Sequence, residues 1–268
     1  MATRVGRCWQ RLQQQGDKAL IGFVMAGDPD FPKSAEIVLA LADAGVDIVE
    51  LGVPFSEPIA DGPVIQRAGD RALRQGAYLP AILDLVKTIR RKSEVPLLLF
   101  SYLNPILRYG LEHFSEDAVA SGADSVLVTD LSVDEAQPFV AVMKRTGLDT
   151  VFLAAPTSTD KRLKRVAEYS TGFVYAISRA GTTGARDTLS SAIGPLLGRL
   201  RAITSLPIAA GFGISRPEHL TQLAPLADGV VVGSALVKVI EEHPDNPAPH
   251  AAEFARWLRT GFTSHPQR

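Results

Sequence analysis

The sequence has a single cysteine, no excess of basic residues and no long apolar run. Cys8 has no partner for an internal disulfide, which is typical of the reducing cytoplasm, so we expect a cytoplasmic protein. Lys and Arg number 28 against 29 Asp and Glu, and this balance disfavours a nucleic-acid partner. No run reaches the roughly 20 apolar residues that cross a bilayer, and the polar N-terminus resembles no targeting segment. We therefore expect neither membrane insertion nor secretion.

What recurs instead is a short run rich in Val, Ile and Leu. Such runs are almost wholly apolar, as parallel strands covered on both faces are. The predicted strands are residues 20–25, 47–51, 96–101, 125–128, 150–153, 173–177, 207–210 and 229–232. Amphipathic segments between them predict helices over residues 33–44, 79–91, 133–146, 161–169, 191–203 and 217–226. Ser215 and Glu218 have the spacing of a capping box at the last of these.

This alternation predicts an α/β fold, a (β/α)8 TIM barrel in which residues 1–268 form one domain and the barrel covers about 18–242. Three additions are expected. Val5, Trp9 and Leu12 indicate an extra N-terminal helix, and residues 51–96 leave room for a loop and two helices in the second βα unit. Residues 243–268 predict a Pro-rich linker followed by a terminal helix over 252–262. A doubly wound open sheet is the alternative, although it would favour fewer strands or a second domain.

Chemistry in such barrels takes place in the loops that follow the strands. None of the eight lysines occurs there, which disfavours a Schiff-base aldolase. The five histidines fall in helices or the tail, so we expect no metal site at the barrel mouth. No P-loop is present. Cys8 is interpreted as a packing or surface residue rather than a nucleophile. These absences leave carboxylates as the candidate acids and bases.

Three carboxylates lie at the end of a predicted strand or in the loop that follows one, and each has two interpretations. Glu50 is either an acid/base whose pKa is raised in an apolar barrel mouth or a structural acid that caps a loop. Asp61 is either a ligand-binding group or the N-cap of a helix that starts near Pro63. Asp130 either orients a ligand or has a capping or loop-bracing role.

Glycine-rich loops follow the last three predicted strands. They contain Gly184, then Gly213, then Gly233 with Ser234. Glycine lets the backbone approach an anion, and the N–H groups of a helix N-terminus point at it. Each loop alone could be an ordinary turn. Together they predict a phosphate site and hence acid/base chemistry on a phosphorylated substrate.

Longer motifs indicate a family. The stretch "ELGVPFSEPIADGPVIQ" closely resembles the signature of the tryptophan synthase alpha chain family, and the similarity extends over residues 20–241. It includes "GDP", "YLNPILRYG", "SVLVTDL", "YAISRAGTTGAR", "GFGIS" and "VGSALVK" in the family's order. The resemblance implies lyase activity in tryptophan biosynthesis: retro-aldol cleavage of indole-3-glycerol phosphate to indole and glyceraldehyde 3-phosphate.

The same resemblance implies roles for individual residues. Glu50 would be the acid/base, Asp61 would bind the indole N–H, and Tyr175 would assist near the reacting centre. Thr183 would lie in a mobile loop that closes over the site and meets Asp61. The phosphate would be held by Gly184, Gly213, Gly233 and Ser234. The indole pocket would consist of Phe23, Ile65, Phe100, Leu127, Thr129, Leu153 and Phe212.

The family also implies a partner. The chain would need no cofactor or metal, and pyridoxal phosphate would belong to a beta chain in an alpha2beta2 heterotetramer. The docking surface would include Pro54, Glu57, Pro58 and Asn104. Glu57 departs from the family's Asp, which puts coupling to the partner in doubt more than catalysis. Two further departures are Ser132, commonly Pro in the family, and Phe100, often aliphatic.

Three other functions remain open at this point. One is a free-standing lyase with the same catalytic residues, and another is a catalytically weak homologue that acts as an allosteric partner of a beta chain. The third is a different phosphate-binding barrel enzyme, such as a sugar-phosphate isomerase, which offers no reason for the pair of Glu50 and Asp61.

Overall fold

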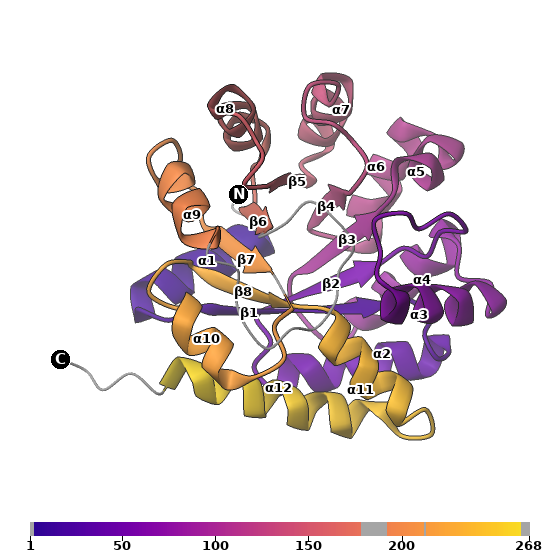
Figure 1. Ribbon diagram of the computed structural model, residues 1–268. Helices are drawn as coiled ribbons and strands as arrows, with labels where there is room; N and C mark the ends of the chain where they lie inside the picture. The colour runs from indigo at the N-terminus through magenta and orange to yellow at the C-terminus, as the bar shows by residue number, and fades with distance from the viewer. Residues whose placement is uncertain (1–2, 178–191, 212, 264–268) are drawn as a thin grey trace.

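The predicted strands form a closed barrel. The computed structural model describes residues 3–177, 192–211 and 213–263, in which eight parallel strands pair in sequence order and the last returns to the first (Figure 1). The closed order excludes the open-sheet alternative. The strands are β1 Ala19–Met25, β2 Ile48–Gly52, β3 Leu97–Ser101, β4 Ser125–Val128, β5 Asp149–Ala154, β6 Val174–Ile177, β7 Ile208–Gly211 and β8 Gly229–Val232.

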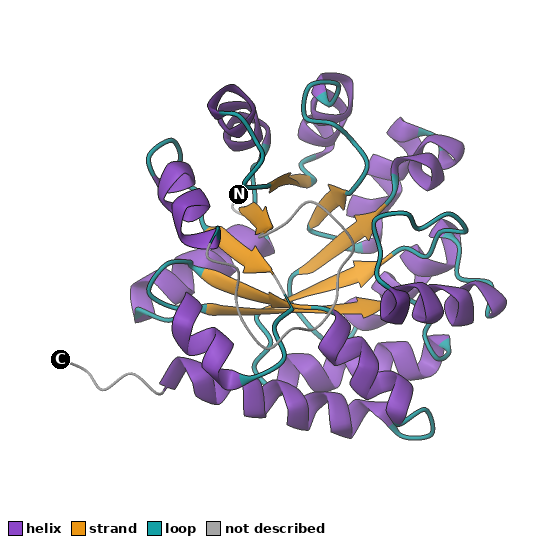
Figure 2. Ribbon diagram, in the orientation of Figure 1, coloured by secondary structure: helices purple, strands orange, loops and turns teal. Residues whose placement is uncertain are grey.

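Helices surround the barrel on the outside (Figure 2). Helix α1 Arg4–Gln15 precedes the barrel, and α12 Pro247–Thr263 follows it. The helices between strands are α2 Phe31–Asp43, α3 Pro63–Arg74, α4 Leu79–Arg90, α5 Leu103–Tyr109, α6 Leu111–Ser121, α7 Gln137–Thr146, α8 Asp160–Tyr169, α9 Ile193–Arg201, α10 Pro217–Leu223 and α11 Ser234–Glu242. The extra N-terminal helix, the second helix between β2 and β3, and the terminal helix are confirmed.

Three predictions at helix N-termini were wrong, although the start of α10 at residue 217 is confirmed. Helix α7 begins at Gln137, four residues after the predicted start at 133. Helix α12 begins at Pro247, so the expected linker is much shorter, because proline is tolerated in the first turn of a helix. The capping box does not form: α10 begins at Pro217 without a side-chain cap, and the Ser215 N–H donates to His219 Nδ1 at 3.3 Å.

The third βα unit contains two helices that the sequence pattern did not predict. Helices α5 and α6 meet at Gly110, whose φ of 96° lies in the region that favours glycine. Helix α5 has only 7 residues, which is too short to give a clear apolar period.

Alternation along each strand separates the barrel interior from the helix layer. Ile48 belongs to the interior cluster, whereas Val49 and Leu51 belong to the cluster between strands and helices. Glu50 therefore points into the barrel, two residues further along than Ile48. The interior layer is formed by Ile21, Ile48, Leu98, Leu127, Val151, Phe173, Ala209 and Val231. Burying one Ile, Leu, Val or Phe side chain stabilises the fold by roughly 1.5–3 kcal/mol.

Helix α1 closes the end of the barrel where the strands begin. Its Trp9 ring contacts Phe173 of the interior at a centroid distance of 5.7 Å. Gly229 makes room for that ring, because a Cβ there would lie 2.8 Å from it. Val5, Leu12 and the Cys8 thiol are buried on the same face, as the packing interpretation of the cysteine requires.

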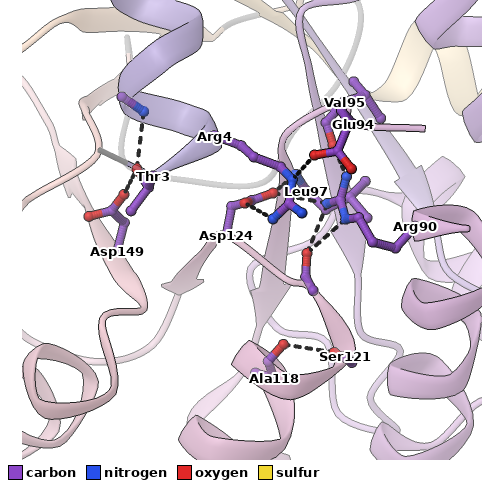
Figure 3. A network of polar contacts seen from close by, with 12 residues as sticks. Thr3, Arg4, Arg90, Glu94, Val95, Leu97, Ala118, Ser121, Asp124 and Asp149 are labelled. Carbon is purple, nitrogen blue, oxygen red and sulfur yellow. Dashed lines mark hydrogen bonds and ion pairs between the residues drawn. The ribbon is translucent and has the colours of Figure 1, made fainter. Parts of the chain in front are cut away.

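Polar contacts at the same end hold α1 against the strand starts (Figure 3). The Thr3 hydroxyl donates to Asp149 at 2.5 Å, and the Arg4 guanidinium contacts Asp124 at 3.2 Å. Arg90 contacts the other Asp124 oxygen at 3.0 Å. The barrel floor is therefore closed by apolar packing and ion pairs, and the opposite end, where the strands terminate, is left for chemistry.

Candidate active site

Glu50 is a buried acid inside the barrel. Its side chain is on β2 between Phe23 of β1 and Leu98 of β3 in the strand register, and only 1% of the residue is exposed. Within the described residues its Oε1 atom has no hydrogen-bond partner. Burial alone raises the pKa of Glu50 to about 8, because the charged form loses its water. Glu50 can therefore hold a proton at neutral pH and release it.

Tyr175 lies close to Glu50. It occupies an inward position on β6, and its ring extends over Gly211 of β7, where any Cβ would overlap it. Burial and the negative charge of Glu50 both raise the pKa of Tyr175 well above its ordinary value. The phenol thus stays protonated and is available as a hydrogen-bond donor beside the acid.

Asp61 lies in the loop between β2 and α3. The N-cap of α3 is Gly62, with no side-chain cap bond, so the N-cap reading of Asp61 was wrong. The Asp61 N–H donates to Pro58 O at 3.0 Å, which folds the loop back on itself. Burial raises the pKa of Asp61 to about 6, and a hydrogen bond from Tyr102 opposes this rise. Its carboxylate is therefore ionised at neutral pH but close to titration.

Tyr102 is a site residue to which sequence reasoning assigned no role. It follows β3 directly, is 3% exposed, and its hydroxyl accepts the Ala60 N–H at 3.0 Å. Its position among the polar residues after each strand was the available signal. In the adjacent loop Asp130 accepts the Leu103 N–H at 2.7 Å, which supports the loop-bracing reading of that carboxylate.

Apolar side chains surround the acids. Phe23 and Phe100 meet edge to face, with centroids 5.3 Å apart and an interplanar angle of 80°. Phe23 and Ile65 belong to one buried cluster, which Phe100 contacts. Leu127 is buried, and Leu153 is partly buried against the interior cluster. These residues of the predicted indole pocket therefore belong to two apolar clusters, and Phe100 packs against both.

The two remaining residues of the predicted indole pocket are Thr129 and Phe212. The Thr129 hydroxyl donates to Ser101 O at 3.3 Å, so its polar atom bonds to the backbone. Phe212 lies outside the described residues.

Part of the predicted phosphate site can be described. Gly213 has a φ of 52°, in the region that favours glycine, and Gly233 is the N-cap of α11 without a side-chain bond. Ser234 is the first residue of that helix. A Cβ built on Gly233 would lie 3.8 Å from Phe23 and 4.0 Å from Ile65, so this helix start adjoins their apolar cluster. Gly184 and Thr183 lie outside the described residues.

Ion pairs tie together the elements that carry these groups. Arg71 of α3 binds Asp28, in the loop that follows β1, through two hydrogen bonds of 2.7 and 2.8 Å. The same guanidinium donates to Glu241 of α11 at 2.7 Å, and Arg67 binds Glu241 from the surface. Asp28 is 3% exposed. The strand that bears Phe23 and the helix that begins at Ser234 are thus held to α3.

The predicted partner surface is only partly exposed. Glu57 and Asn104 are exposed and Pro58 is partly exposed, but Pro54 is buried beside Gly69 of α3. Ile59, in the same loop, is 79% exposed and was not predicted. Its signal was an apolar residue in a Pro-rich loop of otherwise small and acidic residues. The exposed part of this surface is therefore formed by residues 56–59 and α5.

Two features are absent from the part of the chain that the structure describes. Residues 3–177, 192–211 and 213–263 contain no group of three or more His, Cys, Asp or Glu side chains able to hold a metal. No helix in these ranges is long and apolar enough to cross a membrane.

Comparison with known proteins identifies the family. The family model of the tryptophan synthase alpha chain matches residues 9–262. The chain belongs to the tryptophan synthase alpha chain family. It is 53% identical to the tryptophan synthase alpha chain of Solibacter usitatus, over 97% of this chain and 98% of that one.

Solved structures agree with the assignment to the tryptophan synthase alpha chain family. The subunit alpha from Legionella pneumophila superposes with a TM-score of 0.92 at 32% identity, covering 99% of this chain and 100% of that one. A tryptophan synthase complex from Pyrococcus furiosus contains a chain that superposes with a TM-score of 0.85 at 41% identity, covering 90% and 98%. The family's alpha-chain barrel is therefore confirmed for this member.

A cavity at the opposite end of the barrel does not belong to this site. It has a volume of about 590 Å³ and lies between α1 and the loops before β2 and β3. Arg11 and Arg259 line it, and both bind Asp47, at 2.7 and 2.9 Å. These guanidinium groups hold α1 and α12 to the barrel floor.

Proposed function

We propose that this chain is the alpha subunit of tryptophan synthase and cleaves indole-3-glycerol phosphate to indole and glyceraldehyde 3-phosphate. The observation that carries the proposal is the Glu50 carboxyl group. It is buried inside the barrel, its Oε1 has no partner among the described residues, and its pKa is raised to about 8. A carboxyl that gives and takes a proton near neutral pH is what this reaction requires.

The reaction needs two proton transfers. Protonation of indole C3 makes that carbon tetrahedral and leaves a positive charge on the indolenine. Loss of the proton from the hydroxyl on the adjoining glyceryl carbon then makes the aldehyde, and the electrons of the breaking carbon–carbon bond return to the indole ring. Glu50 delivers the first proton and its carboxylate accepts the second, so the acid is regenerated.

Other residues bind the substrate and stabilise the charge that develops on it. The Asp61 carboxylate accepts the indole N–H and offsets the positive charge of the indolenine. The edge-to-face pair of Phe23 and Phe100 forms a wall for the planar ring. The N-terminus of α11 at Ser234 directs its N–H groups at the phosphate. These transfers use side chains alone, so we propose that the chain carries no cofactor or metal.

The alpha chain works, in this proposal, with a beta chain in the cytoplasm. The related Pyrococcus furiosus protein is a tryptophan synthase complex. The exposed residues Glu57, Ile59 and Asn104 form the docking surface here. Pyridoxal phosphate belongs to the beta chain, which receives the indole.

The proposal is tested by measuring indole release from indole-3-glycerol phosphate with and without a cognate beta chain. We expect slow release by the isolated chain and faster release in the complex. Full activity without a partner would instead identify a free-standing lyase, and no activity in either case would identify an allosteric homologue.

Substitution of the proposed acid gives the sharpest mutational test. Glu50→Gln keeps the shape of the side chain but removes the proton donor, so turnover is expected to fall by about a thousandfold. Binding of substrate, followed by equilibrium titration, should persist. The control is Glu253→Gln, the same change on an exposed position of α12, which should leave turnover unchanged. Near-normal turnover by Glu50→Gln would refute the assignment.

A further inference from the structure

The Tyr102 side chain contacts both parts of the loop that joins β2 to α3. Its hydroxyl accepts the Ala60 N–H at 3.0 Å and lies beside the Asp61 carboxylate, whose pKa it lowers as a hydrogen-bond donor. Its ring contacts Phe55 at a centroid distance of 5.2 Å and an interplanar angle of 35°. A single buried side chain thus connects the surface segment around residues 55–58 with the carboxylate of the site.

The hydrogen bonds fix the direction in which the hydroxyl acts. A phenol has one proton to donate, and its oxygen can accept. Because the Ala60 N–H occupies an acceptor site on the oxygen, the phenol proton is available to the Asp61 carboxylate. Burial, followed by the negative charge of Asp61, raises the pKa of Tyr102. Tyr102 therefore remains protonated, which makes it a permanent donor and not an acid or base in the reaction.

We propose that Tyr102 is the positioning residue that holds the Asp61 carboxylate for the indole N–H, with its ring fixed by Phe55. This inference rests on the proposed function, in which Asp61 binds the indole. It also gives the docking surface a route to the reaction, because a partner that moves Phe55 moves the hydroxyl that holds Asp61.

The charged groups around Asp61 set the sign of the expected pH effect. Among the described residues, burial raises its pKa to about 6, and the Tyr102 hydrogen bond lowers it. Asp130, in the loop after β4, acts on Tyr102 rather than on Asp61, and raises the pKa of the phenol. Removing the Tyr102 hydroxyl therefore raises the pKa of Asp61. The ionised carboxylate that the reaction needs then appears only at higher pH.

The test is Tyr102→Phe, which keeps the ring against Phe55 and removes only the hydroxyl. We expect kcat/KM at pH 6 to fall by about tenfold, as for loss of a hydrogen bond to a charged group, and to recover partly by pH 8. The acid limb of the pH profile should move to higher pH. A profile of unchanged shape, whatever the absolute rate, would overturn the proposal, because a structural defect alone lowers the rate without moving the limb.

Tyr109→Phe is the matched control. Its hydroxyl donates to Asp117 at 2.6 Å, so the substitution removes a second tyrosine–aspartate hydrogen bond at the other end of α5. The pH profile of this variant should coincide with that of the parent. Substrate phosphate titrates in the same range, but equally in every variant.

A readout without activity separates this proposal from the proposed function. The pKa of the Asp61 carboxyl can be followed by carbon-13 NMR in the intact chain. It should be higher in Tyr102→Phe than in the parent, even if the parent does not cleave indole-3-glycerol phosphate. If Tyr102→Phe does not fold, Phe55→Leu should raise the same pKa by a smaller amount. An unchanged Asp61 pKa in the folded variant would refute the positioning role.

Discussion

At the scale of single residues, the barrel mouth contains a group that opposes folding. Glu50 is buried, its Oε1 atom has no hydrogen-bond partner among the described residues, and its pKa is raised from 4.5 to about 8. Between these two values the unfolded chain is ionised while the folded chain keeps the proton. Because the unfolded state binds fewer protons there, stability falls as the pH rises through this window. The proposed acid/base Glu50 thus lowers the free energy of unfolding in this pH range.

Glu50→Gln is therefore expected to stabilise the protein. One pKa unit corresponds to about 1.4 kcal/mol, so the rise from 4.5 to about 8 gives an expected gain in unfolding free energy of about 4 kcal/mol at pH 8. Little gain is expected at pH 4, where both states are protonated. Urea unfolding at the two pH values measures the difference. Glu253→Gln, on the surface of α12, should show no such dependence on pH. Equal stability of parent and Glu50→Gln at pH 8 would contradict the raised pKa.

At the scale of elements, α3 connects the parts of the site. Its Arg71 binds Asp28 after β1 and Glu241 in α11, while the Arg67 side chain is 52% exposed and binds Glu241 alone. Both arginines lower the pKa of Glu241, to about 2, mainly through the hydrogen bond from Arg67. The contact that matters for stability is nevertheless the buried one. A buried carboxylate that loses its partner cannot regain water, whereas an exposed one can.

Two arginine variants separate these contributions. Arg71→Met leaves Asp28 buried and unpaired, and is expected to cost about 3 kcal/mol of unfolding free energy. Arg67→Met breaks a surface pair and should cost less than about 1 kcal/mol. Chemical denaturation measures both. Adding Asp28→Asn to Arg71→Met should restore part of the loss, because the unpaired charge is removed. Equal costs for the two arginines would show that burial of Asp28 is unimportant.

At the scale of the whole molecule, the candidate site and the proposed docking surface share one loop between β2 and α3. This loop carries Glu57 and Ile59 on the outside and the partly buried Asp61, and Tyr102, between β3 and α5, contacts it. Glu57 has one methylene more than the Asp typical of the family, so its carboxylate reaches further from the same backbone. Because Glu57 is exposed and apart from the buried acids, its effect should concern the partner.

Glu57→Asp is accordingly expected to change the stimulation of indole release by the beta chain. The rate of the isolated chain should stay within about twofold, as for an exposed substitution outside the site. The ratio of rates with and without the beta chain is the quantity to measure. Glu116→Asp, an exposed position on α6, serves as the control. A large loss of rate in the isolated Glu57→Asp chain would assign this residue to the chemistry.

Local patterns determined the elements. The ends of each strand were predicted to within about two residues, because a short apolar run between polar turns is typical of a buried strand. The pattern was weakest where elements are short or begin with proline, as in α5 and at Pro247 in α12. Glu50 was also predictable, because an acid at the end of an apolar strand has no packing reason to be there.

Contacts between distant segments were decided only by the tertiary structure. The sequence left Asp61 between an N-cap and a ligand group, and the fold of the loop excluded the N-cap by placing Gly62 there. The contact of Asp61 with Tyr102 joins residues that are far apart in the chain. The same holds for Tyr175 beside Glu50, whose proximity follows from barrel closure. Sequence alone thus determined which groups lie at the strand ends. The pKa of each group depends on its burial and its neighbours, and only the closed barrel sets these.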